Sequence, residues 1–441
     1  MSEAPSAIEA ASCARRRSIR LSPVMKEVGR RTVLCFGLAS GTLSLLGRDA
    51  QADDSAKRKR STASVTSFPY SVPRAGQALL IGNNFAADVR PPSHSAHQWN
   101  YALFLSYGGG TYVEDYSAGG AYVIAGSGGH AHPPNFGGCL FDFADATWKR
   151  IDNANGMPWR NRDLDSPEIN RFGEISYPDV SDGIPAPAHL YGNVLPLSAA
   201  NGGGSRGSAL LLRSQAAGAS SNHGSGYAHR FDLSTGLWTR QSTNAAIGGR
   251  SPYRTACYDR ATNRYYMIRQ YLHGSGNLDY LDGADWTWKT VGIGRPAPDG
   301  DNKSAFIDDS RRLLIMQTST GKLRAIDLND MRSGPVTLRT AGDLPRVNQS
   351  QWHLYPADGC WYTYVGNGGN DVYKIEPPAA NPLANTWTVS TVVIGGAALP
   401  SQPAAAIKSG AVHNTRFFYV RPLGCFAWIA GGSNQVAILK P

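Results

Sequence analysis

Phe231-Asp-Leu-Ser-Thr-Gly-Leu-Trp238 is the stretch that decides the fold of this 441-residue chain. It joins the end of an apolar strand to an aspartate, a tight turn and a tryptophan that opens the next strand. The same six-residue spacing from Asp to Trp recurs between Asp142 and Trp148 and between Asp282 and Trp288. Because a short unit that recurs every 40–50 residues or so is typical of propellers, the repeat predicts four-stranded blades.

A second phrase opens each unit and reads as a strand, a polar turn and another strand. Clear copies run over 256–267, 305–316, 353–364 and 418–428. The alternation of side chains and the Gly, Asn, Asp and Pro residues in the turns favour antiparallel hairpins. Weaker copies of the first phrase occur at Asp327 and Glu376. Together the phrases predict six units, over residues 110–151, 188–243, 253–292, 303–340, 351–393 and 411–441.

The last unit stops after its third strand, 435–440, so closure of the ring requires a strand from elsewhere. Closure removes exposed sheet edges, and an N-terminal segment is the natural donor. Residues 77–81 (Gln-Ala-Leu-Leu-Ile) and 101–105 (Tyr-Ala-Leu-Phe-Leu) are both candidates. We therefore predict an all-β propeller of six four-stranded blades closed by an N-terminal strand. A count of seven stays open, because residues 75–110 are hard to place.

These phrases resemble the kelch type of β-propeller, the family that includes the propeller domain of galactose oxidase. The resemblance covers about 110–441 and rests on the Asp–Trp phrase and on paired glycines after the second strand, at Gly128-Gly129, Gly368-Gly369 and Gly431-Gly432. It implies blades of this type and, by itself, no function. The copper-radical site of galactose oxidase requires an adjacent Tyr-His pair, which is missing here; Tyr271-Leu-His273 only approaches it.

The N-terminal segment is typical of an export signal. Arg30-Arg31 precede a modest apolar run over 33–47, and Ala50-Gln-Ala52 forms a small-x-small cleavage site. The paired arginines indicate a twin-arginine signal. We expect residues 1–52 to be an extension and signal, 53–74 a polar basic linker and 75–441 the propeller. The protein is then periplasmic or secreted, with no membrane span after signal removal. Met1 and Met25 are both possible starts.

The net charge of +10 is concentrated near the N-terminus. Residues 1–52 hold eight Lys/Arg and four Asp/Glu, which leaves 35 − 29, or +6, for the remainder. Four of those positive charges are Lys57-Arg58-Lys59-Arg60 in the linker, so the folded part is near +2. A nucleic-acid-binding protein needs basic residues gathered on one face. We therefore expect no nucleic-acid partner.

Four cysteines follow the cleavage site: Cys139, Cys257, Cys360 and Cys425. An oxidising compartment permits disulfides, but four cysteines allow three pairings and the sequence does not choose among them. No Cys-x-x-Cys motif occurs, which argues against a structural zinc site.

Histidines concentrate at one predicted end of the ring. In a four-stranded blade, the loop between strands two and three lies at the same end as the connection to the next blade. His130, His132, His223 and His273 fall in such loops, and the 153–187 insertion lies between blades at that end. A long insertion without a strand pattern is usually functional or disordered. We expect it either to cover the axial pocket or, as the alternative, to pack against a neighbouring blade or be disordered.

Alignment of the first strands places Glu114, His189 and His353 at one inner position, around the central channel. These three are the candidate catalytic residues, and His189 and His353 are the candidate metal ligands. Imidazole and carboxylate suit zinc, copper or iron, and also general acid–base chemistry. The alternative is a water-filled channel whose polar residues satisfy one another.

Three hypotheses follow for function. The first is an exported propeller that binds a small molecule or glycan, such as a carbohydrate or cell-envelope component, on its axial face. The second is a metal-dependent or acid–base enzyme, and the third is a scaffold for another envelope protein. We expect a monomer. The candidate ligand-binding residues are His130, His132, Trp159, His223, His273, Tyr191 and Tyr355, and Tyr177 is a further stacking candidate.

Overall fold

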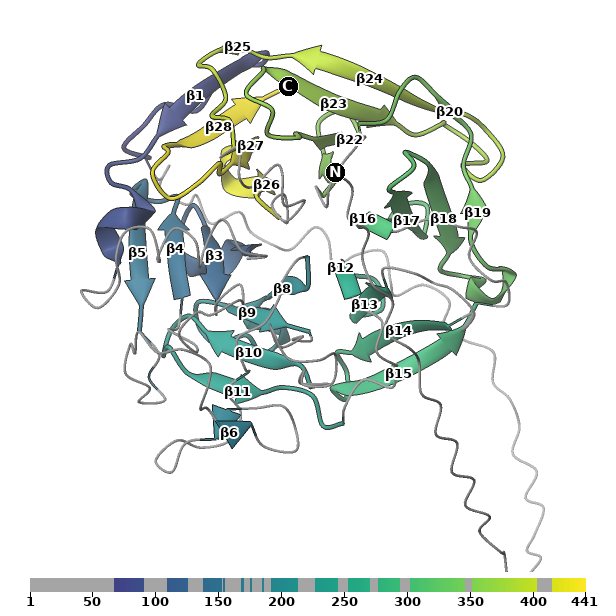
Figure 1. The fold of residues 1–441 in the computed structure, drawn as a ribbon, viewed down its shortest axis with the longest axis horizontal. Helices are drawn as coiled ribbons and strands as arrows, with labels where there is room; N and C mark the ends of the chain where they lie inside the picture. The colour runs from purple at the N-terminus through teal and green to yellow at the C-terminus, as the bar shows by residue number, and fades with distance from the viewer. Residues whose placement is uncertain are drawn as a thin grey trace, which may run out of the picture. The chain divides into compact units, whose positions relative to one another are not determined.

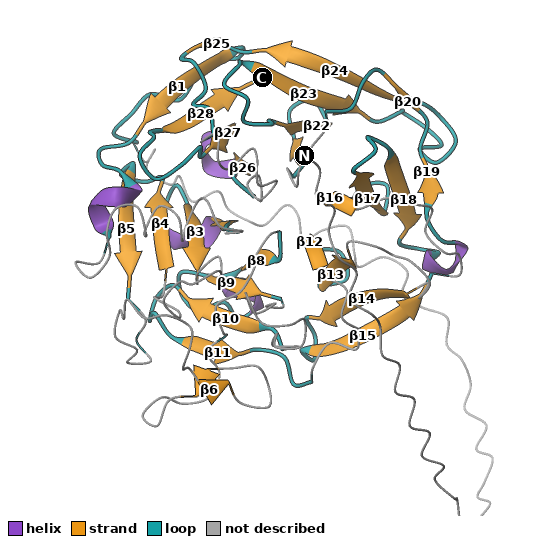
Figure 2. Ribbon diagram, in the orientation of Figure 1, coloured by secondary structure: helices purple, strands orange, loops and turns teal. Residues whose placement is uncertain are grey.

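The fold is described from a computed structural model of the chain. The structure describes residues 67–90, 109–125, 138–152, 154, 168–169, 175–176, 185, 192–212, 227–244, 253–269, 277–293, 302–345, 351–402 and 415–441. Apart from short 3-10 turns, these residues form strands and loops (Figure 2).

Six antiparallel sheets follow one another around a ring, with the first strand of each sheet nearest the axis (Figure 1). The all-β prediction and the count of six four-stranded blades are confirmed. The strands of the first three blades are β2 to β5 (Thr111–Val113, Ala121–Ala125, Gly138–Asp142, Thr147–Ile151), β8 to β11 (Val194–Leu197, Ser208–Leu211, His229–Asp232, Trp238–Arg240) and β12 to β15 (Tyr253–Asp259, Arg264–Arg269, Asn277–Asp282, Thr287–Gly292). Those of the last three are β16 to β19 (Asn302–Asp308, Leu313–Thr318, Leu323–Asp327, Val336–Thr337), β21 to β24 (His353–Tyr355, Cys360–Thr363, Asp371–Glu376, Trp387–Val393) and β26 to β28 (Phe417–Val420, Cys425–Trp428, Val436–Lys440) with β1 (Gln77–Ile81).

Strand β1 closes the ring as the fourth strand of the sixth blade. It runs antiparallel to β28 over five residue pairs, from Gln77 opposite Lys440 to Ile81 opposite Val436. The prediction of an N-terminal closing strand is therefore confirmed, and of the two candidates it is 77–81 that supplies it. Residues 101–105 lie outside the described residues. Because the first and last described strands pair with each other, the ring has no open sheet edge at the termini.

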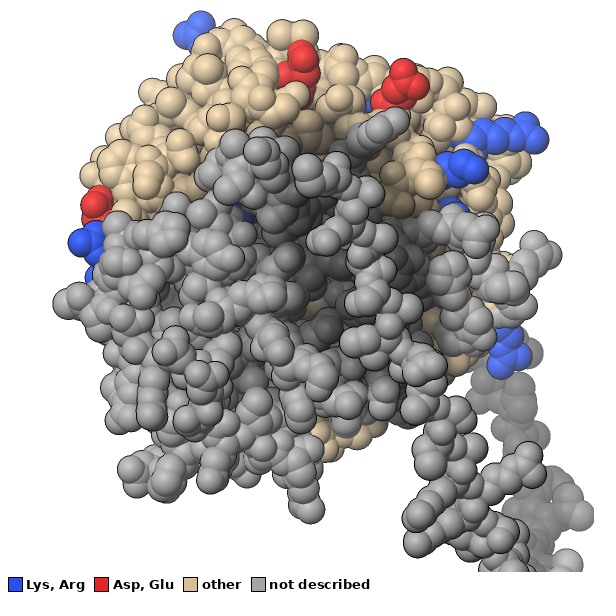
Figure 3. All heavy atoms as spheres, viewed as in Figure 1, with Lys and Arg blue, Asp and Glu red and all other residues tan. Residues whose placement is uncertain are grey.

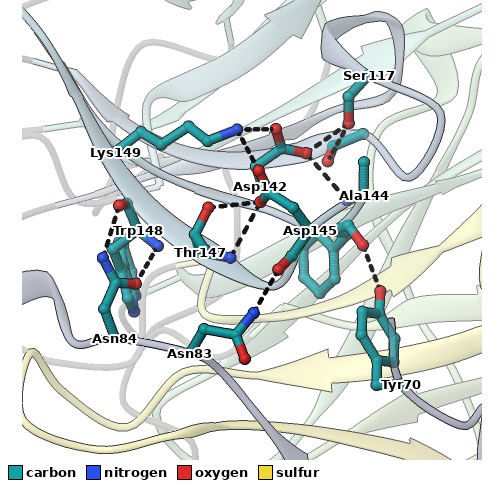
Figure 4. A network of polar contacts seen from close by, with 12 residues as sticks. Tyr70, Asn83, Asn84, Ser117, Asp142, Ala144, Asp145, Thr147, Trp148 and Lys149 are labelled. Carbon is teal, nitrogen blue, oxygen red and sulfur yellow. Dashed lines mark hydrogen bonds and ion pairs between the residues drawn. The ribbon is translucent and has the colours of Figure 1, made fainter. Parts of the chain in front are cut away.

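The Asp–Trp repeat builds the turn between the third and fourth strands. Asp142 Oδ1 accepts a hydrogen bond from the backbone N–H of Ala144 at 2.9 Å, and Lys149 Nζ lies 2.6 Å from Asp142 Oδ2 (Figure 4). Asp232 and Asp282 accept from the backbone two residues on in the same way. The tryptophans that follow are 2% exposed or less and anchor four hydrophobic clusters, at Trp148, Trp238, Trp288 and Trp387. The phrase thus serves packing and turn formation.

The chain that leaves one blade covers the outer edge of the next. After β1, the Asn84 amide accepts from Trp148 N at 2.7 Å and donates to Trp148 O at 3.0 Å, on the outer strand of the first blade (Figure 4). After β11, Asn244 makes the same two bonds to Trp288, at 2.6 and 3.2 Å. Each asparagine pairs with a strand edge as a backbone peptide group would. We call this arrangement the edge staple.

Backbone versions of the edge staple occur at three more junctions. Ala154 N donates to Gly236 O at 2.9 Å, between the first and second blades. Strand β20 (Thr340–Ala341), which follows the fourth blade, pairs in parallel with β24 of the fifth. Strand β25 (Gly395–Gly396) pairs in parallel with β1 of the sixth. These contacts satisfy edge groups that would otherwise be available to another molecule.

We expect Asn244→Ala to lower the free energy of unfolding by about 1–2 kcal/mol, because two hydrogen bonds to the backbone of a buried tryptophan are lost. Asn84→Ala should lose a similar amount, since its bonds have the same geometry. The measurement is urea unfolding followed by tryptophan fluorescence. Asn367→Ala, at an exposed loop position, is the control and should change stability by less than about 0.5 kcal/mol. Equal values for all three variants would contradict the staple.

The 153–187 insertion contains a short hairpin, which the sequence did not reveal. Strand β6 (Glu168–Ile169) pairs antiparallel with β7 (Ile175–Ser176). The expectation that this segment has no strands is wrong for these four residues. Two-residue strands are too short to produce a visible alternation of polar and apolar side chains.

Candidate functional site

The first strands of all six blades surround a central cavity of about 720 Å³. This is within the range of about 300–1,000 Å³ found for small-molecule sites. Each blade contributes the next-to-last residue of its first strand: Tyr112, Pro196, Tyr258, Ile307, Leu354 and Tyr419. The ladder registers place these six one step before the turn to the second strand. We call this end of the ring the turn end and the opposite end the loop end.

Half of these six residues are aromatic, and each of the three rings packs against a second aromatic ring. Tyr258 stacks on Tyr265 with ring centroids 4.5 Å apart. Tyr112 stacks on Phe418 at 5.5 Å. Tyr419 packs edge-on against Phe426, also at 5.5 Å. The three cavity-facing tyrosines are only partly buried. They therefore offer rigid ring surface to a ligand at little cost in conformational entropy.

Charged residues surround the cavity at the turn end. Glu114 opens a 3-10 turn (Glu114–Tyr116) directly after β2, and Arg421 opens the corresponding turn (Arg421–Leu423) after β26. Arg421 Nε lies 3.3 Å from Glu114 Oε2, and both side chains are about half exposed. Arg260 and Asp309 occupy the equivalent positions after β12 and β16. We call these four residues the rim.

Two further ion pairs stabilise the turns that carry the rim residues. Arg312 binds Asp259 with two hydrogen bonds, at 2.6 and 2.8 Å, and so links the fourth blade to the third. Burial alone would raise the pKa of Asp259, but hydrogen bonds from Arg312 and Thr262 outweigh it and hold this pKa below its usual value. Arg311 likewise binds Asp308, at 2.8 Å. These pairs fix the turns on which Arg260 and Asp309 stand.

His353 begins β21 and lines the cavity. Burial lowers its pKa to about 4, despite an opposing hydrogen bond with the backbone of Phe417. The imidazole is therefore neutral at pH 7. Its Nε2 atom is buried and has no hydrogen-bond partner. Its ring lies edge-on to Phe417, with centroids 6.5 Å apart.

The structure brings Glu114 and His353 to the same cavity but at different levels. His353 pairs with Tyr362 two steps before the turn, whereas Glu114 follows the last pair of its ladder. The prediction that Glu114 and His353 occupy equivalent positions on their first strands is therefore wrong, because the two residues lie at different steps of their ladders. The turn after β2 is longer than the one after β12, since the last pairs are Val113–Ala121 and Asp259–Arg264. Whether either residue has a chemical role stays a prediction.

Most other predicted site residues lie outside the described residues, namely His130, His132, Trp159, Tyr177, His189, Tyr191, His223 and His273. Tyr355 is described and is 7% exposed. Its ring packs against Tyr362, Tyr419 and Phe426 between the fifth and sixth blades. In this position Tyr355 supports Tyr419 and has little surface of its own for a ligand. Its predicted role in binding stays untested.

Sequence reasoning missed Arg260, Asp309, Tyr419 and Arg421. A signal for them exists, because each lies at the end of a first strand or immediately after it. Alignment of the copies on their turns, rather than on their strand starts, brings Glu114, Arg260, Asp309 and Arg421 to one position. The histidines in the sequence cluster instead in loops predicted at the loop end.

Reactive cysteines and metal clusters are not found in the described ranges. Cys139, Cys257, Cys360 and Cys425 are all buried free thiols. Burial raises the pKa of Cys425 to about 12 and that of Cys139 and Cys257 further, so these thiols stay protonated. No three His, Cys, Asp or Glu side chains of the described residues gather as a metal site. None of the described helices is long and apolar enough to span a membrane.

Charged side chains are spread thinly over the coloured part of the surface in Figure 3, with both signs near the outer margin. The part of the surface drawn there in colour thus shows dispersed charge rather than one basic face.

No protein-family model and no curated protein matches this sequence. Solved structures resemble it at low identity. One is a structural genomics protein of unknown function from Bacteroides thetaiotaomicron, with 10% identity, a TM-score of 0.44 and coverage of 82% of this chain and 74% of that one. Another is the extracellular domain of a two-component system from the same species, with 11% identity, a TM-score of 0.35 and coverage of 82% and 40%. A chain of a mitotic checkpoint complex has 9% identity, a TM-score of 0.37 and coverage of 92% and 100%. These likenesses carry no argument about function.

Proposed function

We propose that this protein is an exported, kelch-type propeller that binds a carbohydrate in its central cavity. One observation carries the proposal: a cavity of about 720 Å³ has partly exposed tyrosines on its wall and paired charges at its rim. Sugar rings have apolar faces that pack on aromatic rings and hydroxyls that need polar partners. Small-molecule sites generally combine an apolar wall with a few polar groups in this way.

The described residues do not favour a catalytic role in the same cavity. The Glu114 carboxylate already has an ion-pair partner, because Arg421 Nε lies 3.3 Å from its Oε2 atom. The Nε2 atom of His353 is covered by protein. We therefore favour ligand binding over catalysis as the function of this cavity. Export through a twin-arginine signal at Arg30-Arg31 is part of the proposal, and the four buried thiols suit a protein that folds before export, because none needs oxidation.

The test is an oligosaccharide array followed by calorimetric titration of the hits with full-length mature protein. Leu354 is 40% exposed and lines the cavity, so Leu354→Trp should occupy ligand space without disturbing the core. We expect it to weaken binding at least about tenfold. Val393→Trp, on an outer strand at a 71% exposed position, is the matched control and should bind as the wild type does.

Two results would go against the proposal. If no oligosaccharide binds, carbohydrate recognition is wrong. If both tryptophan variants bind equally well, the ligand lies outside the cavity. Export is tested separately by replacement of Arg30 and Arg31 with lysine, which should retain the protein in the cytoplasm.

A further inference from the structure

The described charges that line the cavity balance. Three cations, Arg260, Arg311 and Arg421, face three anions, Glu114, Asp308 and Asp309. His353 adds no charge at pH 7, because burial keeps it neutral. The sum, three minus three, is zero. The chain as a whole carries +10, so this balance is a local property of the described lining.

The rim has one cation and one anion on each of two opposite sides of the ring, and those on one side, Glu114 and Arg421, form an ion pair. Glu114 and Arg421 belong to the first and sixth blades, which are neighbours. Arg260 and Asp309 belong to the third and fourth, which lie three blades away. Asp309 is close enough to Arg260 for this cation to lower its pKa, although burial and Asp259 raise it overall. Each side of the mouth therefore presents one donor and one acceptor.

Several of these groups have bonding capacity to spare. Within the described part of the chain, the Arg260 guanidinium, the Asp309 carboxylate and the Tyr419 hydroxyl make no hydrogen bond. They are accessible rather than sealed, so water satisfies them until a ligand arrives. A hydroxyl group can donate to Asp309 and accept from Arg260 at once.

We infer that the rim selects an electrically neutral, hydroxyl-rich ligand that reaches the cavity from the turn end. This inference rests on the proposed carbohydrate function and specifies its ligand class. A uronate or an amino sugar would lose hydration on entering a rim that offers no net opposite charge. The rim residues of like charge would also repel it. A neutral sugar meets donors and acceptors on both sides without that penalty.

The experiment compares neutral oligosaccharides with uronic-acid and amino-sugar oligosaccharides of equal length, at low and high salt. The wild type should bind the neutral members most tightly. Glu114→Gln and Asp309→Asn make the lining net positive and should shift preference toward the acidic ligands by about three- to fivefold. That is the scale of an exposed ion pair. Arg421→Gln and Arg260→Gln should shift it by a similar factor toward the amino sugars.

Glu376→Gln is the control, because Glu376 is exposed and does not line the cavity. It raises the net charge of the protein by one, as Glu114→Gln and Asp309→Asn do, and should leave the preference unchanged. The shifts in the rim variants should shrink at high salt, since exposed charges are screened. Thermal unfolding of each variant shows that it is folded.

The outcomes separate this inference from the proposed function. Tighter binding of acidic or basic oligosaccharides by the wild type overturns neutral selection but leaves carbohydrate binding intact. Rim variants that match Glu376→Gln overturn the role of the rim. Absence of binding to all three classes overturns the proposed function and this inference with it.

Discussion

Replacement of Ile81 by aspartate is expected to prevent the ring from closing. Ile81 is 5% exposed and packs with Phe141 and Trp148 of the first blade and with Ile438 of the sixth. A carboxylate there would be buried without a partner, which costs several kcal/mol. We expect a loss of at least about 4 kcal/mol in the free energy of unfolding. That is a large share of the stability of a typical domain.

The adjacent residue provides a matched control. Leu80 lies on the same strand but is 39% exposed, so Leu80→Asp should change stability by less than about 1 kcal/mol. Urea unfolding followed by near-ultraviolet circular dichroism measures both variants. A chain that begins after Gly82 should fail to fold cooperatively and should recover when a peptide of residues 67–90 is added. Equal stability of Ile81→Asp and Leu80→Asp would show that closure by β1 is dispensable.

Asp259→Ala should have the second largest effect, a loss of about 3 kcal/mol. Asp259 is fully buried and holds Arg312 through two hydrogen bonds, so its removal leaves the guanidinium without its partner and unlinks the third and fourth blades. Asp145→Ala is the control. Its ion pair with Lys149 is exposed, and its loss should cost less than about 1 kcal/mol.

The same pair predicts a dependence on pH. The folded state lowers the pKa of Asp259, so the unfolded chain binds the proton more readily. Its contribution is therefore complete above the unfolded pKa of about 3.9 and is lost as the pH falls below that value. The gap in unfolding free energy between wild type and Asp259→Ala should be constant from pH 7 to 5 and narrow below pH 4. A gap that persists at pH 2 would contradict this account.

The architecture was predictable because its signals are local. The spacing of six residues from Asp142 to Trp148 contains a whole turn, and the copies of the two repeated phrases together were enough to count the blades. The closing strand was also predictable, because the last repeat unit in the sequence lacks a fourth strand. The edge staples were not predictable, because Asn84 and Asn244 lie 64 and 44 residues from the tryptophans they bind. No common spacing marks them.

The site was harder to predict than the fold. The copies differ in turn length, so alignment on strand starts assigned Glu114 and His353 to one level. Tyr355 looked like a free aromatic because sequence alone does not show which face of a blade meets its neighbour. The rim residues are ordinary charged turn residues in the sequence. They become a group only when six strands converge on one axis.

The edge staple has a consequence for how the ring comes apart. Each stapled blade relies on the segment that leaves the blade before it, so local opening of one blade also frees the edge of the next. Local unfolding then spreads from each blade to the next one along the chain instead of staying within a single blade. Such a ring should exchange the amide hydrogens of Trp148 and Trp288 only when the whole structure unfolds. A propeller joined in this way behaves as one cooperative unit rather than as six separable repeats.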